Sequence, residues 1–256
     1  MIPLRILEFD TLPSSQDDLR RRLLAGDDVH GLVVRAAVQT AARGRRARDW
    51  RAERGGSYQT LAVRDPALTD PHAPSILHPH AALTLALGIA EVLPVYGVQP
   101  GLKWPNDLFY CGKKLAGVLA EAVQGHLLIG VGMNVNNDVP DGATGLRGWD
   151  VDGVHMVVLE GLQRGLAHLA GDAGGDAGGE TGFSLPEAYA PFDLLFGQPL
   201  ELRVGDEVHS GTGAGVDDWG RLQLAGPNGT VAHSSGQLVR YGLRTTLGKR
   251  EMSAER

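Results

Sequence analysis

The chain has 256 residues, of which 43% are hydrophobic and 21% are charged, and its formal net charge is −6. A chain of this length and apolar content can bury a large core as one or two domains. Its negative charge is poorly suited to broad binding of duplex nucleic acid, and its single cysteine, Cys111, can form neither an internal disulfide nor a thiolate metal site by itself.

The first part of the chain predicts, in order, a strand over 4–10, a helix over 14–26, a buried strand over 31–39 and an alternating strand over 57–64. Ser14 or Ser15 is expected to cap the helix, because a hydroxyl there accepts a hydrogen bond from a free backbone N–H. The opening residues "MIPLRILEFD" lack the features of a signal peptide, and no run approaches the ~20 apolar residues that span a bilayer. We therefore expect a cytoplasmic protein with no membrane partner.

The middle of the chain predicts a helix from 79 to about 96, strands and hairpins over 101–105, 107–123 and 126–137, and a second long helix over 154–170. The tract 170–182, "AGDAGGDAGGETG", is too polar and glycine-rich to pack, so we expect a flexible insertion there. From 197 onward, short alternating runs between Gly, Asp and Asn turns are typical of a small β-barrel, in which Trp219 is expected to be a core residue.

Residues 39–50, "QTAARGRRARDW", contain four arginines around one glycine: Arg43, Arg45, Arg46 and Arg48. Guanidinium groups suit carboxylate and phosphate, and four of them on one loop repel one another unless they share an anion. The alternative is a solvated basic loop, which is what most charge runs are. The loop therefore indicates anion binding only in combination with a second motif near the middle of the chain.

That second motif is the stretch 101–121, "GLKWPNDLFYCGKKLAGVLAE". Pro105 cannot continue the hydrogen-bond ladder of a strand, so Asn106 and Asp107 are expected to turn toward a cleft, together with Lys103. An ordinary hairpin with solvated lysines is the alternative reading of the same spacing.

The next apolar strand ends in "GVGMNVNN", residues 130–137. Alternating glycines allow close approach to the backbone, and Asn134 and Asn136 can bond a base or a ribose. Glycines also mark bulges and bends, so this strand end is weak evidence by itself.

Together these stretches resemble the biotin protein ligases. The glycine- and arginine-rich loop of that family appears after Gln39 as "ARGRRARDW", and its lysine-tryptophan-proline-asparagine-aspartate motif appears as "KWPND" followed by "GKKLAGVLAE". Its glycine-asparagine strand end appears as "GVGMNVNN", and "LPSSQ" at 12–16 resembles its first biotin-contacting turn. Order and spacing agree over residues 5–242, and the lysine motif is the most specific part.

The resemblance implies an enzyme that joins the carboxylate of biotin to the α-phosphate of ATP, with Mg²⁺, and then passes biotin to a lysine of a carrier. The carrier is the biotin carboxyl carrier protein domain of a biotin-dependent carboxylase. The sequence contains no cluster of carboxylates that would indicate magnesium ligands. This is consistent with a magnesium ion held mainly by phosphates and water. The family's larger members carry an N-terminal helix-turn-helix, for which the sequence before 4–10 has no room, so we expect a ligase that binds no nucleic acid. Whether it forms a homodimer stays open.

The resemblance also assigns site residues, several of them to more than one role, and none to a metal. Those assigned to biotin are Ser14, Ser15, Gln16, Gln39, Arg43, Gly44, Arg45, Lys103, Lys114 and Gly117. Those assigned to ATP are Arg43, Arg45, Arg48, Trp50, Lys103, Asn106 and Asn134. Those assigned to catalysis are Lys103, Arg45 and Asp107, with Lys103 between the biotin carboxylate and the α-phosphate and Asp107 beside the acceptor lysine. Helix capping by the two serines and a structural turn aspartate are the plainer alternatives.

The chain departs from the family pattern at four positions. Ala42 and Ala47 stand where the family usually has glycine, and because a methyl group disfavours positive φ, the geometry of the arginine loop could differ. Ser15 and Gln16 replace the usual threonine and asparagine but keep a hydroxyl and an amide.

The sequence thus predicts an α+β fold: a mixed β-sheet with helices on one face, followed by a small SH3-like β-barrel. The expected domains are a catalytic unit over 1–195, the barrel over 196–245 and a polar tail over 246–256. Two other functions compete with biotin ligation. A lipoate protein ligase shares the fold and the adenylate chemistry, and a nucleic-acid-binding module would use "RGRR" but lacks the interleaved aromatic residues.

Overall fold

The computed structural model describes residues 2–70, 73, 75–172 and 183–244. One group of strands comprises β1 (Arg5–Leu12), β2 (Leu32–Gln39), β3 (Ser57–Arg64), β4 (Gly101–Lys103), β5 (Asp107–Tyr110), β6 (Lys113–Val123) and β7 (His126–Met133). A second group comprises β8 (Pro199–Val204), β9 (Glu207–Val216), β10 (Leu222–Gly226), β11 (Gly229–His233) and β12 (Gln237–Tyr241). The helices are α1 (Ser15–Leu24), α2 (Ala81–Val92), α3 (Val151–Asp172) and α4 (Leu185–Tyr189), with 3₁₀ turns η1 (Arg45–Ala47), η2 (Pro66–Leu68) and η3 (Leu93–Tyr96).

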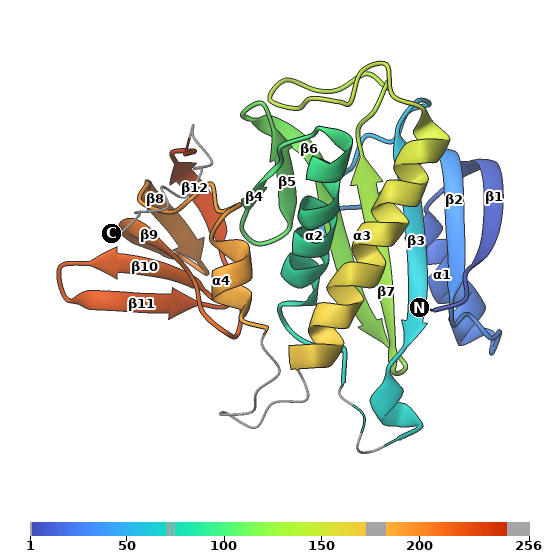
Figure 1. Ribbon diagram of the computed structural model, residues 1–256, viewed down its shortest axis with the longest axis horizontal. Coiled ribbons are helices and arrows are strands. Elements are labelled where there is room, and N and C mark those ends of the chain that lie inside the picture. Colours follow the sequence, from blue (N-terminus) through green and yellow to red (C-terminus); the bar gives the residue numbers. More distant parts are fainter. Residues whose placement is uncertain (1, 71–72, 74, 173–182, 245–256) are drawn as a thin grey trace, which may run out of the picture.

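The described strands form two sheets (Figure 1). The larger is a seven-stranded mixed sheet in the order β1-β2-β3-β7-β6-β5-β4, in which β1 and β2 are parallel and the other pairs are antiparallel. The smaller has five antiparallel strands in the order β11-β10-β9-β8-β12. The predicted α+β class with a mixed sheet is confirmed, and the C-terminal part is a separate antiparallel sheet. No described helix is long and apolar enough to cross a membrane.

Both faces of the larger sheet are covered by helices. Successive residues of a strand point to opposite faces, and on β3 Leu61 belongs to the core beneath α2 and α3 whereas Ala62 belongs to a second core with Leu19 of α1. The prediction of helices on one face is therefore correct for α2 and α3 and wrong for α1. The reason is that β3 and its neighbour β7 are apolar at consecutive positions, so that each face has to be shielded from water.

The start of α1 agrees with the predicted cap. Ser14 has an extended backbone and its hydroxyl accepts a hydrogen bond from the backbone N–H of Asp17, at 3.3 Å. The helix ends before Gly26, whose φ of 89° suits the left-handed turn that follows. Local chemistry therefore fixes where α1 begins, and this places Ser15 and Gln16 in the first turn over the sheet.

Helices α2 and α3 cross at a contact made by glycines. A methyl group on Gly88 of α2 would overlap the carbonyl oxygen of Gly161 and the backbone of Gly165 in α3. The absence of side chains at this point lets the two backbones touch, which packs both helices closely against the sheet.

Two segments predicted from composition lie largely or wholly outside the described residues. Helix α3 continues through Asp172, and the rest of the expected insertion, 173–182, lies outside the described residues, as does the expected polar tail. The prediction of a core position for Trp219 is wrong: the residue is 68% exposed, because it stands on the turn between β9 and β10.

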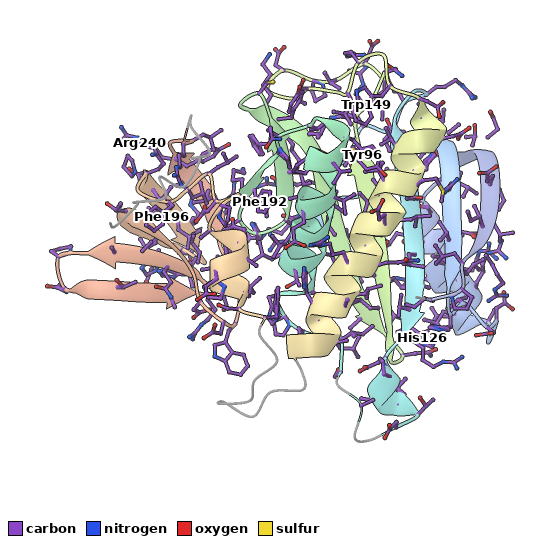
Figure 2. The ribbon with its side chains drawn as sticks, viewed as in Figure 1. Tyr96, His126, Trp149, Phe192, Phe196 and Arg240 are labelled. Carbon is purple, nitrogen blue, oxygen red and sulfur yellow. The ribbon has the colours of Figure 1, made fainter. Side chains whose placement is uncertain are left out.

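A buried segment joins the two sheets. Figure 2 shows the stretch between Phe192 and Phe196 passing from the larger sheet to the smaller one. Leu102 of β4 donates its backbone N–H to Phe192 at 2.7 Å and accepts from Leu194 at 3.0 Å. Between them, Asp193 is 1% exposed; one carboxylate oxygen accepts from the backbone N–H of Leu195 at 2.8 Å, and the other has no hydrogen-bond partner among the described residues. Burial raises the pKa of Asp193 to about 6.

Replacement of Gly88 by alanine should destabilise the protein. Helix propensity alone would favour alanine by about 0.5–1 kcal/mol, but the overlap with α3 should outweigh it and lower the free energy of unfolding by about 1–3 kcal/mol. Urea denaturation measures the change. Gly171→Ala, in α3 with no atom within 4 Å of the new methyl group, is the matched control and should be neutral or stabilising; equal effects would contradict the close crossing.

Replacement of Asp193 by asparagine should stabilise the protein near pH 7. The folded-state pKa is raised, so the folded protein binds a proton more tightly than the unfolded chain, and stability is lost as pH rises from about 4 through about 6. The asparagine side chain keeps the acceptor for Leu195 without the charge. The gain should reach at most about 3 kcal/mol at pH 7 and shrink toward pH 4.5, as measured by thermal melts; a gain independent of pH would contradict the buried charge.

Candidate active site

A cavity of about 240 Å³ lies on the face of the larger sheet that carries α1. Almost every residue selected from the sequence lines it: Ser14, Ser15, Gln16, Gln39, Arg43, Gly44, Arg45, Arg48, Trp50, Lys103, Asn106, Asp107, Lys114 and Gly117. These residues come from four separate stretches of chain. The fold therefore brings together groups that were predicted to be neighbours from the sequence.

Asn134 is the exception, because it is not among the described residues that line the cavity. It is buried, and its side-chain oxygen accepts a hydrogen bond from Asn137 at 3.1 Å. Asn137 in turn accepts from the backbone N–H of Val135 at 3.0 Å. These asparagines hold the turn after β7, and the geometry gives no support to a contact between Asn134 and a nucleotide.

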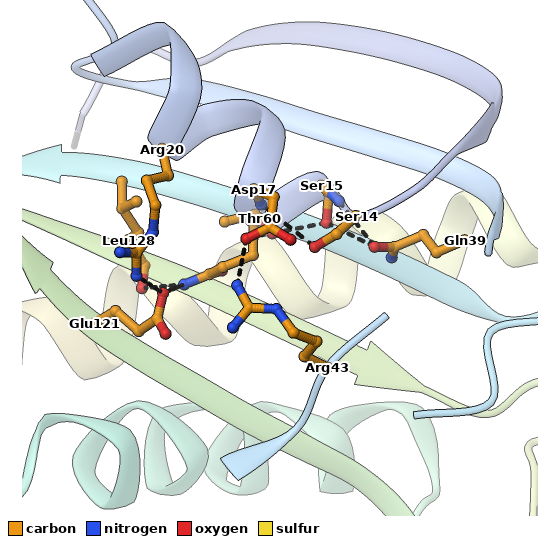
Figure 3. A network of polar contacts seen from close by, with 10 residues as sticks. Ser14, Ser15, Asp17, Arg20, Gln39, Arg43, Thr60, Glu121 and Leu128 are labelled. Atoms are coloured by element: carbon orange, nitrogen blue, oxygen red, sulfur yellow. Dashed lines mark hydrogen bonds and ion pairs between the residues drawn. The ribbon is translucent and has the colours of Figure 1, made fainter. Parts of the chain in front are cut away.

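The first turn of α1 forms one polar wall (Figure 3). Ser15 donates its backbone N–H to the side-chain oxygen of Gln39 at 2.8 Å, and its hydroxyl lies 2.7 Å from that of Thr60 on β3. Ser14 caps α1, as the plainer alternative predicted, and it also lines the cavity. Nothing in the sequence marks Thr60 as a site residue, because a threonine within an apolar strand carries no local signal.

The arginine loop folds over the hairpin that carries the lysine motif. Arg45 donates to the side-chain oxygen of Asn106 at 3.4 Å, and Arg43 is ion-paired with Asp17 of α1. Burial, and then the neighbouring charge of Arg46, lower the pKa of Arg45. Because a cation in this position is destabilised by its surroundings, an anion bound beside it would restore favourable charge pairing.

Alanine at position 42 is compatible with the loop geometry. The residue with left-handed backbone is Arg46, at φ 57°, and not Ala42. The methyl group of Ala42 is buried with Ala52, Tyr58 and the partly buried Trp50. The replacement of glycine at this position therefore fills a small apolar cluster without straining the backbone.

Two lysines meet one carboxylate beneath this loop. Asp107 accepts from the ammonium of Lys114 at 2.7 Å and lies 3.6 Å from that of Lys103. The side chains of Asp107 and Lys103 are each 15% exposed. Lys103 also lies 5.4 Å from the ring centre of Phe109 and 4.4 Å from that of Tyr241. The ammonium groups are thus held by charge and by aromatic faces in a partly desolvated site.

The smaller sheet contributes to the site, although none of the predicted site residues belongs to it. Residues Gly236–Leu238 line the cavity, and Tyr241 contacts Lys103. The buried indole of Trp104 donates to the carbonyl oxygen of Gly220 at 3.0 Å, which ties the lysine hairpin to the turn between β9 and β10. No sequence signal could reveal these contacts, since the partners lie more than 100 residues apart.

Two paired glycines form a flat floor under Trp50. Gly117 of β6 and Gly132 of β7 are cross-strand partners. A Cβ on Gly132 would lie 2.6 Å from two indole atoms of Trp50, whereas one on Gly117 would lie at an ordinary 3.5 Å. Lys114 lies 5.2 Å from the centre of the same ring. The indole therefore rests between bare backbone and an ammonium group.

Alanine at Gly132 should displace Trp50 from the cavity floor. The overlap should lower the free energy of unfolding by about 1–3 kcal/mol and change the near-ultraviolet circular dichroism contributed by Trp50, which the Trp50→Phe variant identifies. Gly117→Ala is the matched control, since its methyl group fits, and it should leave that signal in place. If both variants behave alike, the indole does not rest on Gly132.

Comparison with known proteins identifies the family. A sequence model described as the biotin/lipoate A/B protein ligase family matches residues 11–138. A biotin–[acetyl-CoA-carboxylase] ligase of Mycobacterium tuberculosis is 34% identical, over 88% of this chain and 85% of its own length. This chain belongs to that family. The biotin protein ligase class and activity predicted from the sequence are confirmed.

Other members of the family support the same reading. The biotin–[acetyl-CoA-carboxylase] ligase of Paracoccus denitrificans is 30% identical over 77% of this chain and 85% of its own length. A solved structure of the Aquifex aeolicus biotin protein ligase in complex with biotin and ATP has a TM-score of 0.75 and 24% identity, and covers 94% of this chain and 99% of the other. That similarity shows that the two chains share a fold.

Proposed function

We propose that the cavity converts biotin and ATP to biotinyl-5′-AMP and then transfers biotin to a lysine of a biotin carboxyl carrier protein domain. The observation that carries the proposal is the meeting of Lys103, Lys114 and Asp107 with the arginine loop in one cavity. A site for joining a carboxylate to a triphosphate has to gather cations, because the two reactants repel each other.

In the first step a biotin carboxylate oxygen attacks the α-phosphorus of ATP, and pyrophosphate leaves. Lys103, held by Asp107 and the two aromatic rings, stabilises the charge where the two anions meet. Arg43, Arg45 and Arg48 hold the phosphates, with Arg43 exchanging Asp17 for a phosphate oxygen. The loop then shields the mixed anhydride from water, which would otherwise hydrolyse it.

In the second step the acceptor lysine amine attacks the biotinyl carbonyl, AMP leaves, and the amine gives up a proton. Asp107 lines the cavity beside Lys103 and Lys114, and it orients the incoming ammonium and takes its proton. The close contact with Lys114 supports this role, because a second ammonium can replace one that is already bound there.

The other residues that line the cavity are assigned to biotin or to the nucleotide by the polar groups that they offer. Ser15, Gln39 and the Gly44 backbone face the ureido ring of biotin, and Trp50 and Asn106 face the nucleotide. Within the described residues no group of three or more His, Cys, Asp or Glu side chains could hold a metal ion. Magnesium supplied with ATP would be held mainly by phosphate oxygens and water, and it would offset the charge of the phosphates.

The smaller sheet is proposed to be an SH3-like barrel domain over 196–245 that closes the site built by residues 1–195. Lining by Gly236–Leu238 and the contact of Tyr241 with Lys103 support it. A cytoplasmic location and the absence of a nucleic-acid partner stay predictions from the sequence, and homodimer formation stays open.

The direct test is biotin-dependent exchange of pyrophosphate into ATP. The protein should catalyse the exchange with biotin and not with lipoate, because its motif is that of the biotin branch of the family. Exchange driven by lipoate alone would move the chain to the lipoate branch, and no exchange with either acid would contradict adenylate formation.

Replacement of Lys103 by alanine should slow adenylation by about 10²–10³-fold, the scale seen when one preorganised electrostatic group is removed. Lys103→Arg should restore it only in part, because a planar fork is not a compact charge. Synthetic biotinyl-5′-adenylate bypasses the first step, so carrier labelling from it should approach the wild-type rate. Lys113→Ala, which changes an exposed lysine at the start of β6, is the control. Equal loss of both half-reactions in Lys103→Ala would contradict a role for Lys103 chiefly in adenylation.

A further inference from the structure

Tyr241 of the smaller sheet lies against the ammonium group of Lys103, which the proposed function places where the two reactants meet. The ammonium is 4.4 Å from the ring centre of Tyr241 and 5.4 Å from that of Phe109. A cation within about 6 Å of a ring face is attracted by the negative potential of the π electrons. Tyr241 is therefore the nearer of the two rings that hold this cation.

The carboxylate of Asp107 is shared unequally between the two lysines of the site. It lies 2.7 Å from the ammonium of Lys114 and 3.6 Å from that of Lys103, so its charge is offset chiefly by Lys114. A ring face attracts an ammonium group without carrying a net negative charge. Tyr241 can thus hold Lys103 in place without adding a second carboxylate that would compete with substrate anions.

Backbone hydrogen bonds fix the position of Tyr241 relative to Lys103. Tyr241 is the last residue of β12, the strand at one edge of the smaller sheet. Just beyond it, the backbone N–H of Arg244 donates to the carbonyl oxygen of Leu194 at 2.8 Å, and the N–H of Leu194 donates to the carbonyl oxygen of Leu102 at 3.0 Å. Leu102 precedes Lys103 in β4. Two hydrogen bonds therefore connect the chain at the end of β12 to the strand that carries the lysine.

Neither ring lines the cavity. Lys103 is among the described residues that line it, whereas Tyr241 and Phe109 are not. The rings therefore act on bound reactants through the ammonium group that they hold, and not by direct contact.

We propose that Tyr241 is a positioning residue for adenylation, because the face of its ring keeps the Lys103 ammonium directed into the cavity. The smaller sheet then supplies part of the setting of the cation on which the first half-reaction depends. The inference rests on the proposed function. It assigns no role to the phenol hydroxyl, and none to Tyr241 in the transfer of biotin to the carrier.

Replacement of Tyr241 tests the contact through the adenylation rate. Tyr241→Leu should lower kcat for biotin-dependent pyrophosphate exchange by about 3–30-fold, the change that corresponds to the loss of one cation–π contact. The KM for biotin should change less, since the contact matters most where charge gathers in the transition state. Tyr241→Phe keeps the ring face and should retain most of the rate.

Tyr96→Leu is the matched control for this substitution. Tyr96, labelled in Figure 2, is 44% exposed against 39% for Tyr241, and it is not among the described residues that line the cavity. Its replacement should leave the exchange rate unchanged.

A fluorinated series separates attraction by the ring face from simple packing. Phenylalanine with one, two or three ring fluorines is incorporated at position 241 of the full chain, and each fluorine weakens the negative potential of the ring face with little change in ring size. The logarithm of the exchange rate should fall with each added fluorine. A flat series would show that the ring only fills space, and it would overturn the inference.

A double variant shows whether Tyr241 acts through the lysine. In the Lys103→Ala background, Tyr241→Leu should add no further loss of exchange, whereas independent contributions would multiply. Carrier labelling from synthetic biotinyl-5′-adenylate should stay near the wild-type rate in Tyr241→Leu. Multiplied losses in the double variant, or an equal loss in carrier labelling, would overturn the inference.

The outcomes separate this inference from the proposed function. A folded wild-type protein without biotin-dependent exchange would overturn both. A wild-type protein that catalyses exchange, with Tyr241→Leu as active as Tyr96→Leu, would overturn the inference alone. Thermal melts identify a loss of rate that comes from unfolding, and the fluorinated series, which keeps the shape of the ring, decides the question if the leucine variant does not fold.

Discussion

The repulsion between its cations is the constraint that this site has to satisfy before any ligand arrives. Lys103 and Lys114 share the carboxylate of Asp107, and Arg43 is paired with Asp17 on another element. Each pair offsets part of the cost of holding positive charge in a partly desolvated cavity. The surrounding framework, from the α1 turn to the tie between Trp104 and Gly220, keeps these pairs in place. A substrate anion can then replace Asp17 at Arg43, and the other cations already lie close together.

At three positions, glycine serves this fold by leaving room for a neighbouring group and not by bending the chain. At the crossing of α2 and α3, Gly88 lets two helix backbones touch. On the opposite face of the sheet, Gly132 gives the indole of Trp50 a flat surface, and Gly130 leaves space for the amide of Gln16. The same residue type therefore brings the helices close on one face and shapes the cavity on the other, and neither role needs positive φ.

Features decided by neighbouring residues could be predicted, and features decided by distant contacts could not. The cap of α1, the strands and the motif residues of the cavity follow from local pattern or from the family resemblance. Three features depend on which surfaces meet after folding. They are the position of α1 on the face of the larger sheet away from α2 and α3, the exposure of Trp219, and the hydrogen bond that turns Asn134 toward Asn137. The contact of Tyr241 with Lys103 also depends on distant residues. The sequence around Tyr241 does not indicate that a lysine lies against its ring.

The contact of Tyr241 with Lys103 has a consequence for synthesis of the chain. Residues Gly236–Leu238 and Tyr241 complete the wall around a hairpin that leaves the ribosome about 130 residues earlier. A growing chain can form the larger sheet and its arginine loop while the site is still open on one side. A chain that ends before Gly236 therefore lacks this wall, so its cavity stays open to water and Lys103 lacks its contact with Tyr241.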